Sequence, residues 1–103
     1  MSEQKKKVCL VIGAGDATGG AIAKRFAAEG YVAVPVRRKI EHLEDLTAEI
    51  KSAGNQVVPV GCDARDEEQM IRLFNKVEDE IGELAVAAFG KNIGFDFSFF
   101  QMF

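Results

Sequence analysis

The chain has 103 residues, of which 48% are hydrophobic and 28% charged, and its formal net charge at pH 7 is −3. This size and composition predict one folded domain with its own core, and they exclude collagen-like and largely disordered chains. The slight acidity argues against nucleic acid or an anionic membrane as a partner, and no apolar run approaches the about 20 residues of a membrane span.

Strand and helix patterns alternate from the first apolar segment onward. Residues 8–12 read Val-Cys-Leu-Val-Ile, a continuous apolar run typical of a central parallel strand that is covered on both faces. We expect a helix over residues 20–29, because apolar residues recur there at four-residue spacing, and Gly30 supplies a left-handed stop. The valine-rich run over residues 31–36 predicts the second strand.

The same alternation continues through the second half of the chain. A second amphipathic helix ends at Gly54, and residues 56–60 read as a third strand. A third apolar helix face lies between residues 70 and 81, with Asp66 as its expected N-cap, and residues 84–89 predict a fourth strand. This order predicts an α/β, Rossmann-like half-fold with one parallel sheet in the strand order 3-2-1-4 and helices on both faces.

The last residues carry an aromatic pattern. Five of the eight phenylalanines lie between residues 95 and 103, at first in alternation with polar residues, as in a strand with one apolar face. Such a segment would aggregate if it were exposed. We therefore expect a folded domain over residues 1–92 and a hydrophobic tail over residues 93–103. The tail is expected to pack on the sheet edge or on a partner subunit, and the chain to form a homo-oligomer.

A glycine-rich turn directly follows the first predicted strand. It reads Gly-Ala-Gly-Asp-Ala-Thr-Gly over residues 13–19 and leads into an alanine-rich helix. Because glycine lacks a side chain, the backbone can approach a pyrophosphate, and free N–H groups at the helix start attract the negative charge. The turn therefore predicts that residues 1–92 bind a dinucleotide. The residues expected to form the cradle are Gly13, Gly15, Asp16, Ala17, Thr18 and Gly19.

A basic pair, Arg37 and Arg38, stands at the end of the second predicted strand. Folds that prefer NAD place an acid near this point to bind the ribose hydroxyls, whereas arginine binds the 2′-phosphate of NADP with a planar fork of donors. NADP is therefore the expected cofactor and NAD is disfavoured. The alternative is a solvated strand end without a ligand.

Asp63 and Ala64 follow the third predicted strand. An acid at this position can accept a hydrogen bond from the adenine amino group while the neighbouring backbone holds the ring. The alternative role for Asp63 is helix capping, which Asp66 could equally fill.

These positions together resemble the short-chain dehydrogenase/reductase family, whose pattern the chain follows from about residue 7 to about residue 90. The resemblance rests on Gly13, Gly15, Ala17, Gly19, the Ala-Ala-Glu-Gly stop at residues 27–30, Arg38 and Asp63. Family members usually show Thr-Gly-x-x-x-Gly-x-Gly at the turn, and here Ile12 replaces the threonine and Ala17 the middle glycine. The resemblance implies an NADP(H)-dependent oxidoreductase, with the cofactor lying across the carboxyl ends of the strands. It also implies that Gly90, from a scrambled Asn-Asn-Ala-Gly element, flanks the cofactor.

The catalytic half of the family pattern does not occur in the sequence. The family places a serine on the fifth strand and a Tyr-x-x-x-Lys pair on the next helix, but the one tyrosine here, Tyr31, opens the second strand. We therefore expect a chain truncated before its catalytic residues, with weak or no standard hydride transfer and with an unknown substrate. The alternatives are a non-catalytic nucleotide-binding module and other chemistry, such as hydrolysis, in the exposed crevice.

The single histidine and the two cysteines do not form a set with metal-ligand spacing, so no metal site is expected. His42 is expected on the solvated side of the second helix. Cys9 and Cys62 fall in or just beyond predicted strands, and we expect them to be buried thiols in a reducing cytoplasm.

Overall fold

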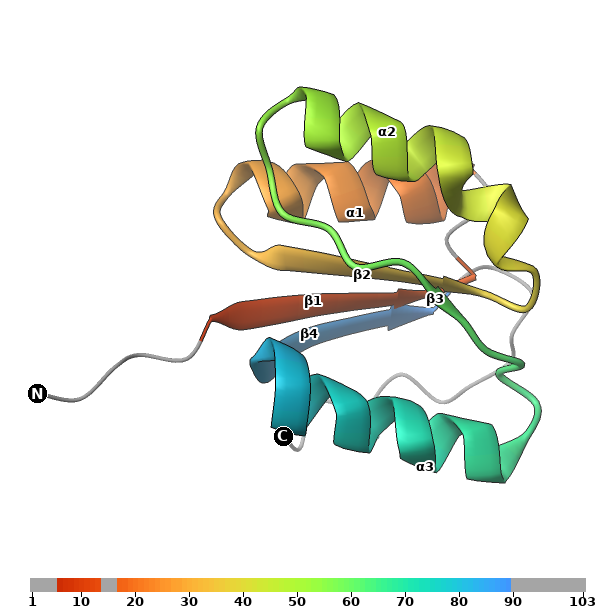
Figure 1. Ribbon diagram of the computed structural model, residues 1–103. Helices are drawn as coiled ribbons and strands as arrows, with labels where there is room; N and C mark the ends of the chain where they lie inside the picture. Colours follow the sequence, from red (N-terminus) through yellow and green to blue (C-terminus); the bar gives the residue numbers. More distant parts are fainter. Residues whose placement is uncertain (1–5, 14–16, 90–103) are drawn as a thin grey trace, which may run out of the picture.

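The structure, a computed structural model, describes residues 6–13 and 17–89. Four parallel strands form one sheet in the order β3-β2-β1-β4 (Figure 1). The strands are β1 (Lys7–Ile12), β2 (Val32–Arg37), β3 (Val60–Gly61) and β4 (Glu83–Phe89). The predicted fold class and strand order are therefore confirmed.

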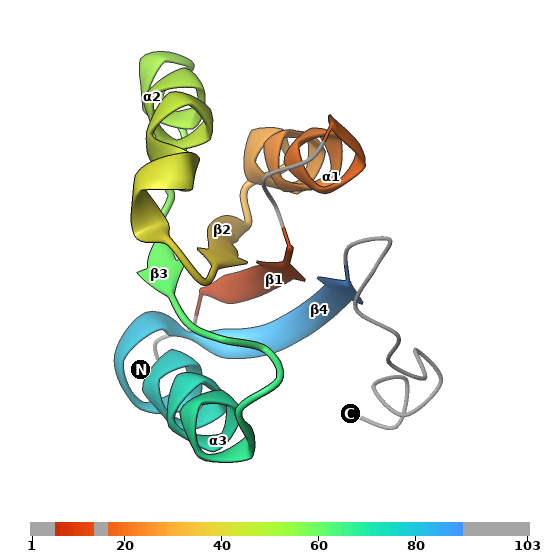
Figure 2. The same ribbon diagram turned by 90° about the vertical axis from the view of Figure 1, so that its right-hand side faces the viewer.

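Helices cover both faces of this sheet, as Figure 2 shows in a view roughly along the strands. Helices α1 (Ala17–Ala28) and α2 (Glu44–Ser52) lie on one face, and α3 (Glu67–Lys76) lies on the other. A 3₁₀ turn, η1 (Ile40–Leu43), leads into α2, and a π turn, η2 (Val77–Ile81), continues α3. No helix in the described part of the chain is both long and apolar enough to cross a membrane.

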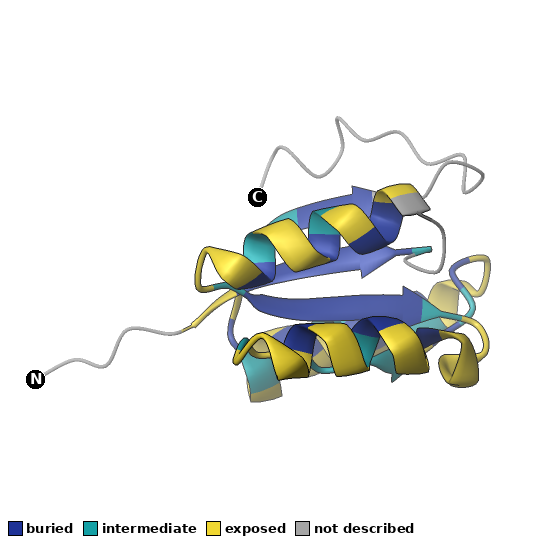
Figure 3. Ribbon diagram, turned by 90° about the horizontal axis from the view of Figure 1, so that it is seen from above, coloured by how far each residue is buried: buried dark blue, intermediate teal, exposed yellow. Residues whose placement is uncertain are grey.

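The central strand β1 divides the apolar core in two. Val8, Leu10 and Ile12 face α3, whereas Cys9 and Val11 face α1 and α2. All five residues are at most 1% exposed. Figure 3 looks onto the face that carries α1 and α2 and shows buried strands behind helices whose outer surfaces are exposed. A strand buried on both faces needs an apolar residue at every position, which explains why β1 is a continuous apolar run rather than an alternating one.

The third strand is much shorter than the predicted run over residues 56–60, so that prediction was wrong in extent. Val57 makes only an isolated bridge to Ala33, and regular pairing with β2 is limited to Val60 and Gly61. Ala33 and Arg37 of β2 bond to this run, and Pro35 between them has no N–H to donate, so the ladder is interrupted there.

Helix α1 begins earlier than the predicted start at residue 20. Its first turn contains Thr18, Gly19 and Gly20, and both glycines are buried. Small residues allow a helix to pack closely on a sheet, and this packing offsets their weak helix propensity. The predicted stop is confirmed, because Gly30 has a φ of +98°.

Asp66 caps α3, as predicted. Its Oδ1 accepts from the backbone N–H of Gln69 at 3.2 Å, and its Oδ2 accepts from the Gln69 side chain at 3.1 Å. The first of these bonds satisfies one of the unpaired backbone donors at the start of the helix.

We expect Asp66→Ala to lower the free energy of unfolding by about 1 kcal/mol, because this first-turn donor loses its acceptor. Urea denaturation followed by circular dichroism measures the change. Asp66→Asn keeps an acceptor oxygen and should remain close to the wild type. Equal losses in the two variants would show that the charge matters and that the cap does not.

The predicted tail over residues 93–103 lies outside the described residues. The division of the chain at residue 92 and the packing of the tail therefore stay predictions.

Candidate functional site

The predicted binding residues gather along one edge of the sheet. The four strands run parallel, so their carboxyl ends share an edge, where Ile12 of β1 is level with Val36 of β2. Gly13, Arg38 and Asp63 follow the ends of β1, β2 and β3 at this edge (Figure 1). In open α/β sheets, ligands bind at the carboxyl ends of the strands.

The turn after β1 begins in a conformation that favours glycine. Gly13 has a φ of +82°, and its N–H donates to the carbonyl oxygen of Val36 at 2.8 Å. This bond ties the start of the turn to β2. Thr18 is exposed and Gly19 is buried in the first turn of α1. The roles predicted for Gly15 and Asp16 stay predictions, because residues 14–16 lie outside the described part; Ala17 is the first residue of α1.

The end of β2 carries two arginines. Arg37 is half-buried, and Arg38 is exposed. Neither side chain lies within 4 Å of an acid among residues 6–13 and 17–89. Both guanidinium groups therefore keep donors for an anion at this edge.

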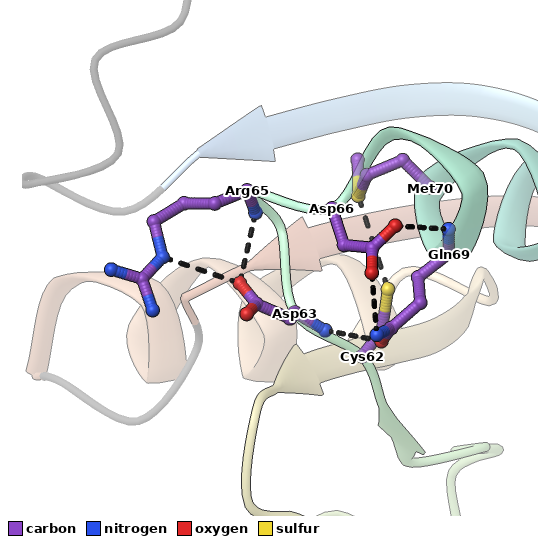
Figure 4. Close-up of polar contacts among 6 residues, drawn as sticks. All are labelled: Cys62, Asp63, Arg65, Asp66, Gln69 and Met70. Atoms are coloured by element: carbon purple, nitrogen blue, oxygen red, sulfur yellow. Dashed lines mark hydrogen bonds and ion pairs between the residues drawn. The ribbon is translucent and has the colours of Figure 1, made fainter.

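The carboxylate of Asp63 is held by Arg65 (Figure 4). Its Oδ1 accepts from the backbone N–H of Arg65 at 3.0 Å and from the Arg65 Nε at 3.3 Å. The backbone hydrogen bond, together with the Arg65 side chain and the positive charge of Arg38, lowers the pKa of Asp63 below its ordinary value. The group is therefore an ionised acceptor at neutral pH, and Asp66, not Asp63, caps α3.

The loop that carries Asp63 is fixed by backbone bonds. The N–H of Cys62 donates to the carbonyl oxygen of Arg37 at 2.9 Å, and the N–H of Asp63 donates to the Gln69 side chain at 2.8 Å. Ala64 is 9% exposed and packs in the core cluster on the α3 side. The end of β2 and the Asp63 loop are thus held side by side.

Arg65 is a site residue that sequence reasoning missed. The signal was its position two residues after Asp63, where a side-chain oxygen can accept from the backbone N–H and form an Asx turn. Adenine binding and helix capping are the two roles that the sequence suggests for Asp63, and neither involves Arg65.

Other polar candidates lie away from the site. Tyr31 precedes β2 and packs edge-on against Phe26 with 5.1 Å between ring centroids, at the amino ends of the strands. His42 is exposed in η1, not on α2 as predicted. Cys9 and Cys62 are buried free thiols, and burial raises the pKa of Cys9 to about 11. No group of three metal-binding side chains occurs in the described part.

Sequence comparison links this geometry to known proteins. The short chain dehydrogenase family pattern matches residues 7–96. Dehydrogenase/reductase SDR family member 11 of Bos taurus is 32% identical over 82 residues, which cover 78% of this chain and 32% of that protein. The chain spans about a third of the length of the curated relatives that it matches.

Solved structures share the fold. A short-chain dehydrogenase from Rhodopseudomonas palustris is 42% identical with a TM-score of 0.76, covering 86% of this chain and 42% of that one. A metagenomic short-chain oxidoreductase in complex with NADP is 27% identical with a TM-score of 0.76, covering 84% of this chain and 39% of that one. With the family pattern matched from residue 7 to residue 96, the chain belongs to the short-chain dehydrogenase family.

Proposed function

We propose that this chain binds NADP(H) at the carboxyl edge of the sheet, as the cofactor-binding part of an oxidoreductase. The observation that carries the proposal is the pair of guanidinium groups of Arg37 and Arg38, which have no acid within 4 Å among the described residues. The two arginines follow the second strand at the position where a fold that prefers NAD carries a carboxylate for the ribose hydroxyls. The similar metagenomic oxidoreductase, which was solved with NADP, supports this cofactor choice.

The described residues fit a dinucleotide in three places. The left-handed turn at Gly13, followed by the start of α1, suits the pyrophosphate. The two arginines suit the 2′-phosphate. The ionised Asp63 suits the adenine amino group, since its Oδ2 makes no bond to Arg65. When bound, the cofactor would supply the hydride of an oxidoreductase reaction.

We also propose that this chain alone performs hydride transfer weakly or not at all. General acid–base catalysis is typically worth about 10²–10⁴-fold in rate. The one tyrosine of the sequence, Tyr31, lies at the opposite edge of the sheet, and no Tyr-x-x-x-Lys occurs within residues 1–103. The second candidate function, a module that holds NADP(H) without turnover, is favoured by the same observation.

Assembly and location complete the proposal. We propose a homo-oligomer, because β4 is an edge strand of the described sheet and, within the described residues, pairs on one side only, with β1. We propose a cytoplasmic location on the ground that Cys9 and Cys62 are both unpaired thiols.

Titration of the purified chain with NADPH and NADH, followed by cofactor fluorescence, tests the cofactor proposal. Arg38→Ala should weaken NADPH binding by about 10- to 100-fold, because charge-assisted hydrogen bonds are worth about 1.5–3 kcal/mol. NADH binding should change little. Arg25→Ala is the matched control, since Arg25 is an exposed arginine near the far end of α1, paired with Glu29.

Equal losses of NADPH and NADH affinity in Arg38→Ala would contradict the 2′-phosphate assignment. A wild-type chain that binds neither cofactor at millimolar concentration would contradict the proposed function as a whole. Oxidation of bound NADPH, followed with a panel of carbonyl compounds, then separates a slow enzyme from a binding module.

A further inference from the structure

The Arg65 side chain is a cation at the site that the cofactor proposal does not use. It is 74% exposed, and its Nε lies 3.3 Å from Oδ1 of Asp63, which is 29% exposed. The same Oδ1 also accepts the backbone N–H of Arg65 at 3.0 Å. One residue therefore binds one carboxylate oxygen twice, in an arrangement that fixes the direction of the carboxylate (Figure 4).

Arg38 lies within electrostatic reach of the same carboxylate. Its positive charge contributes to the lowered pKa of Asp63, although no ion pair within 4 Å joins the two side chains. The backbone segments that carry Arg38 and Asp63 are also close, because the N–H of Cys62 donates a hydrogen bond to the carbonyl oxygen of Arg37 at 2.9 Å. A β-carbon added at Gly61 would lie 3.8 Å from the carbonyl oxygen of Arg38.

An ionised carboxylate in this position is a competitor for the Arg38 guanidinium. Carboxylates and phosphates both bind an arginine through its fork of donors, so an unrestrained Asp63 could occupy the donors that a phosphate needs. Partial neutralisation of Asp63 by a second cation weakens this competition.

We propose that Arg65 is a positioning residue that sets cofactor specificity: by holding Asp63, it keeps the Arg38 guanidinium available to the 2′-phosphate of NADP(H). This inference rests on the proposed function. Arg65 acts through Asp63 and does not itself bind the phosphate. The second oxygen of Asp63 remains free of Arg65 and can accept from the adenine amino group.

A double-mutant cycle tests the inference. The dissociation constants of NADPH and NADH are measured for the wild type, Arg65→Ala, Asp63→Asn and the double variant, and the readout is the ratio of Kd for NADH to Kd for NADPH. Arg65→Ala should lower this ratio about fivefold, the size of an ordinary coupling between neighbouring groups. In the Asp63→Asn background, where the competing charge is absent, the same change should leave the ratio unaltered.

Two controls complete the design. Arg65→Lys restores a cation beside Asp63 and should recover part of the ratio. Arg25→Ala removes an equal charge away from the site and should leave the ratio at the wild-type value.

The outcomes are distinguishable. A wild-type chain that prefers NADPH, together with an unchanged ratio in Arg65→Ala, overturns this inference and leaves the proposed function standing. An equal fall of the ratio in both backgrounds also overturns it, because Arg65 would then act on the phosphate directly. A wild-type chain that binds neither cofactor, or does not prefer NADPH, overturns the specificity assignment first and this inference with it.

Discussion

Leu10→Ala is expected to lower the free energy of unfolding by about 2–5 kcal/mol, the range measured for buried leucines. Leu10 is 0% exposed at the middle of β1 and packs in the core cluster on the α3 side. Strands β2 and β4 hold the backbone of β1 from both sides, so the site cannot collapse around the missing atoms. Since small domains have about 5–15 kcal/mol of stability, a substantial part would be lost.

Urea denaturation measures this loss, and Ile71→Ala is the matched control. Ile71 is a similar aliphatic residue on α3, but it is 52% exposed. Its truncation should cost no more than about 0.5 kcal/mol. A Leu10→Ala variant that is no less stable than Ile71→Ala would contradict the position of β1 at the centre of the core.

Gly82→Ala is expected to lower the free energy of unfolding by about 3 kcal/mol, at the upper end of the usual cost of overpacking. Gly82 lies between η2 and β4, where an added β-carbon would overlap the carbonyl oxygen of Lys6. That oxygen also accepts the N–H of Glu83 at 2.7 Å. Because the obstacle is backbone, it cannot rotate away as a flexible side chain would, and the start of the β1–β4 pairing must shift.

Gly61→Ala is the control for this variant. A β-carbon at Gly61 would lie 3.4 Å from the β-carbon of Ile40, which is an ordinary contact. Its stability should stay within about 0.5 kcal/mol of the wild type. Thermal unfolding of both variants gives the comparison, and equal melting temperatures would contradict the close approach of Lys6 to Gly82.

The strands that the sequence predicts best are those that helices cover on both faces of the sheet. Val8 to Ile12 is apolar at every position because α3 packs on one side and α1 and α2 on the other. The third strand could not be delimited in this way, because Pro35 of the neighbouring strand β2 cannot donate to it, while its own valines still fit a strand pattern. The η1 and η2 turns were also missed, because 3₁₀, α and π turns differ in hydrogen bonding more than in apolar spacing.

The candidate site likewise has parts that the sequence could predict and parts that it could not. Gly13 was predictable because the turn after this buried strand requires a positive φ, which glycine adopts more easily than any other residue. The bond between Arg65 and Asp63 was not predictable, because it depends on where two exposed side chains point. The predictions for Gly15, Asp16 and Gly90 concern positions outside the described residues.

The sheet order also bears on how the chain folds during its synthesis. The ribosome releases β1 before the other three strands of the described sheet, and β2 follows soon after, but the strand that pairs with the other side of β1 begins only at Glu83. At about 5–20 residues per second, one side of this very apolar segment stays without its partner for several seconds. Chaperone capture and misassociation of the nascent chain should therefore centre on Val8 to Ile12, and they should subside once β4 has emerged.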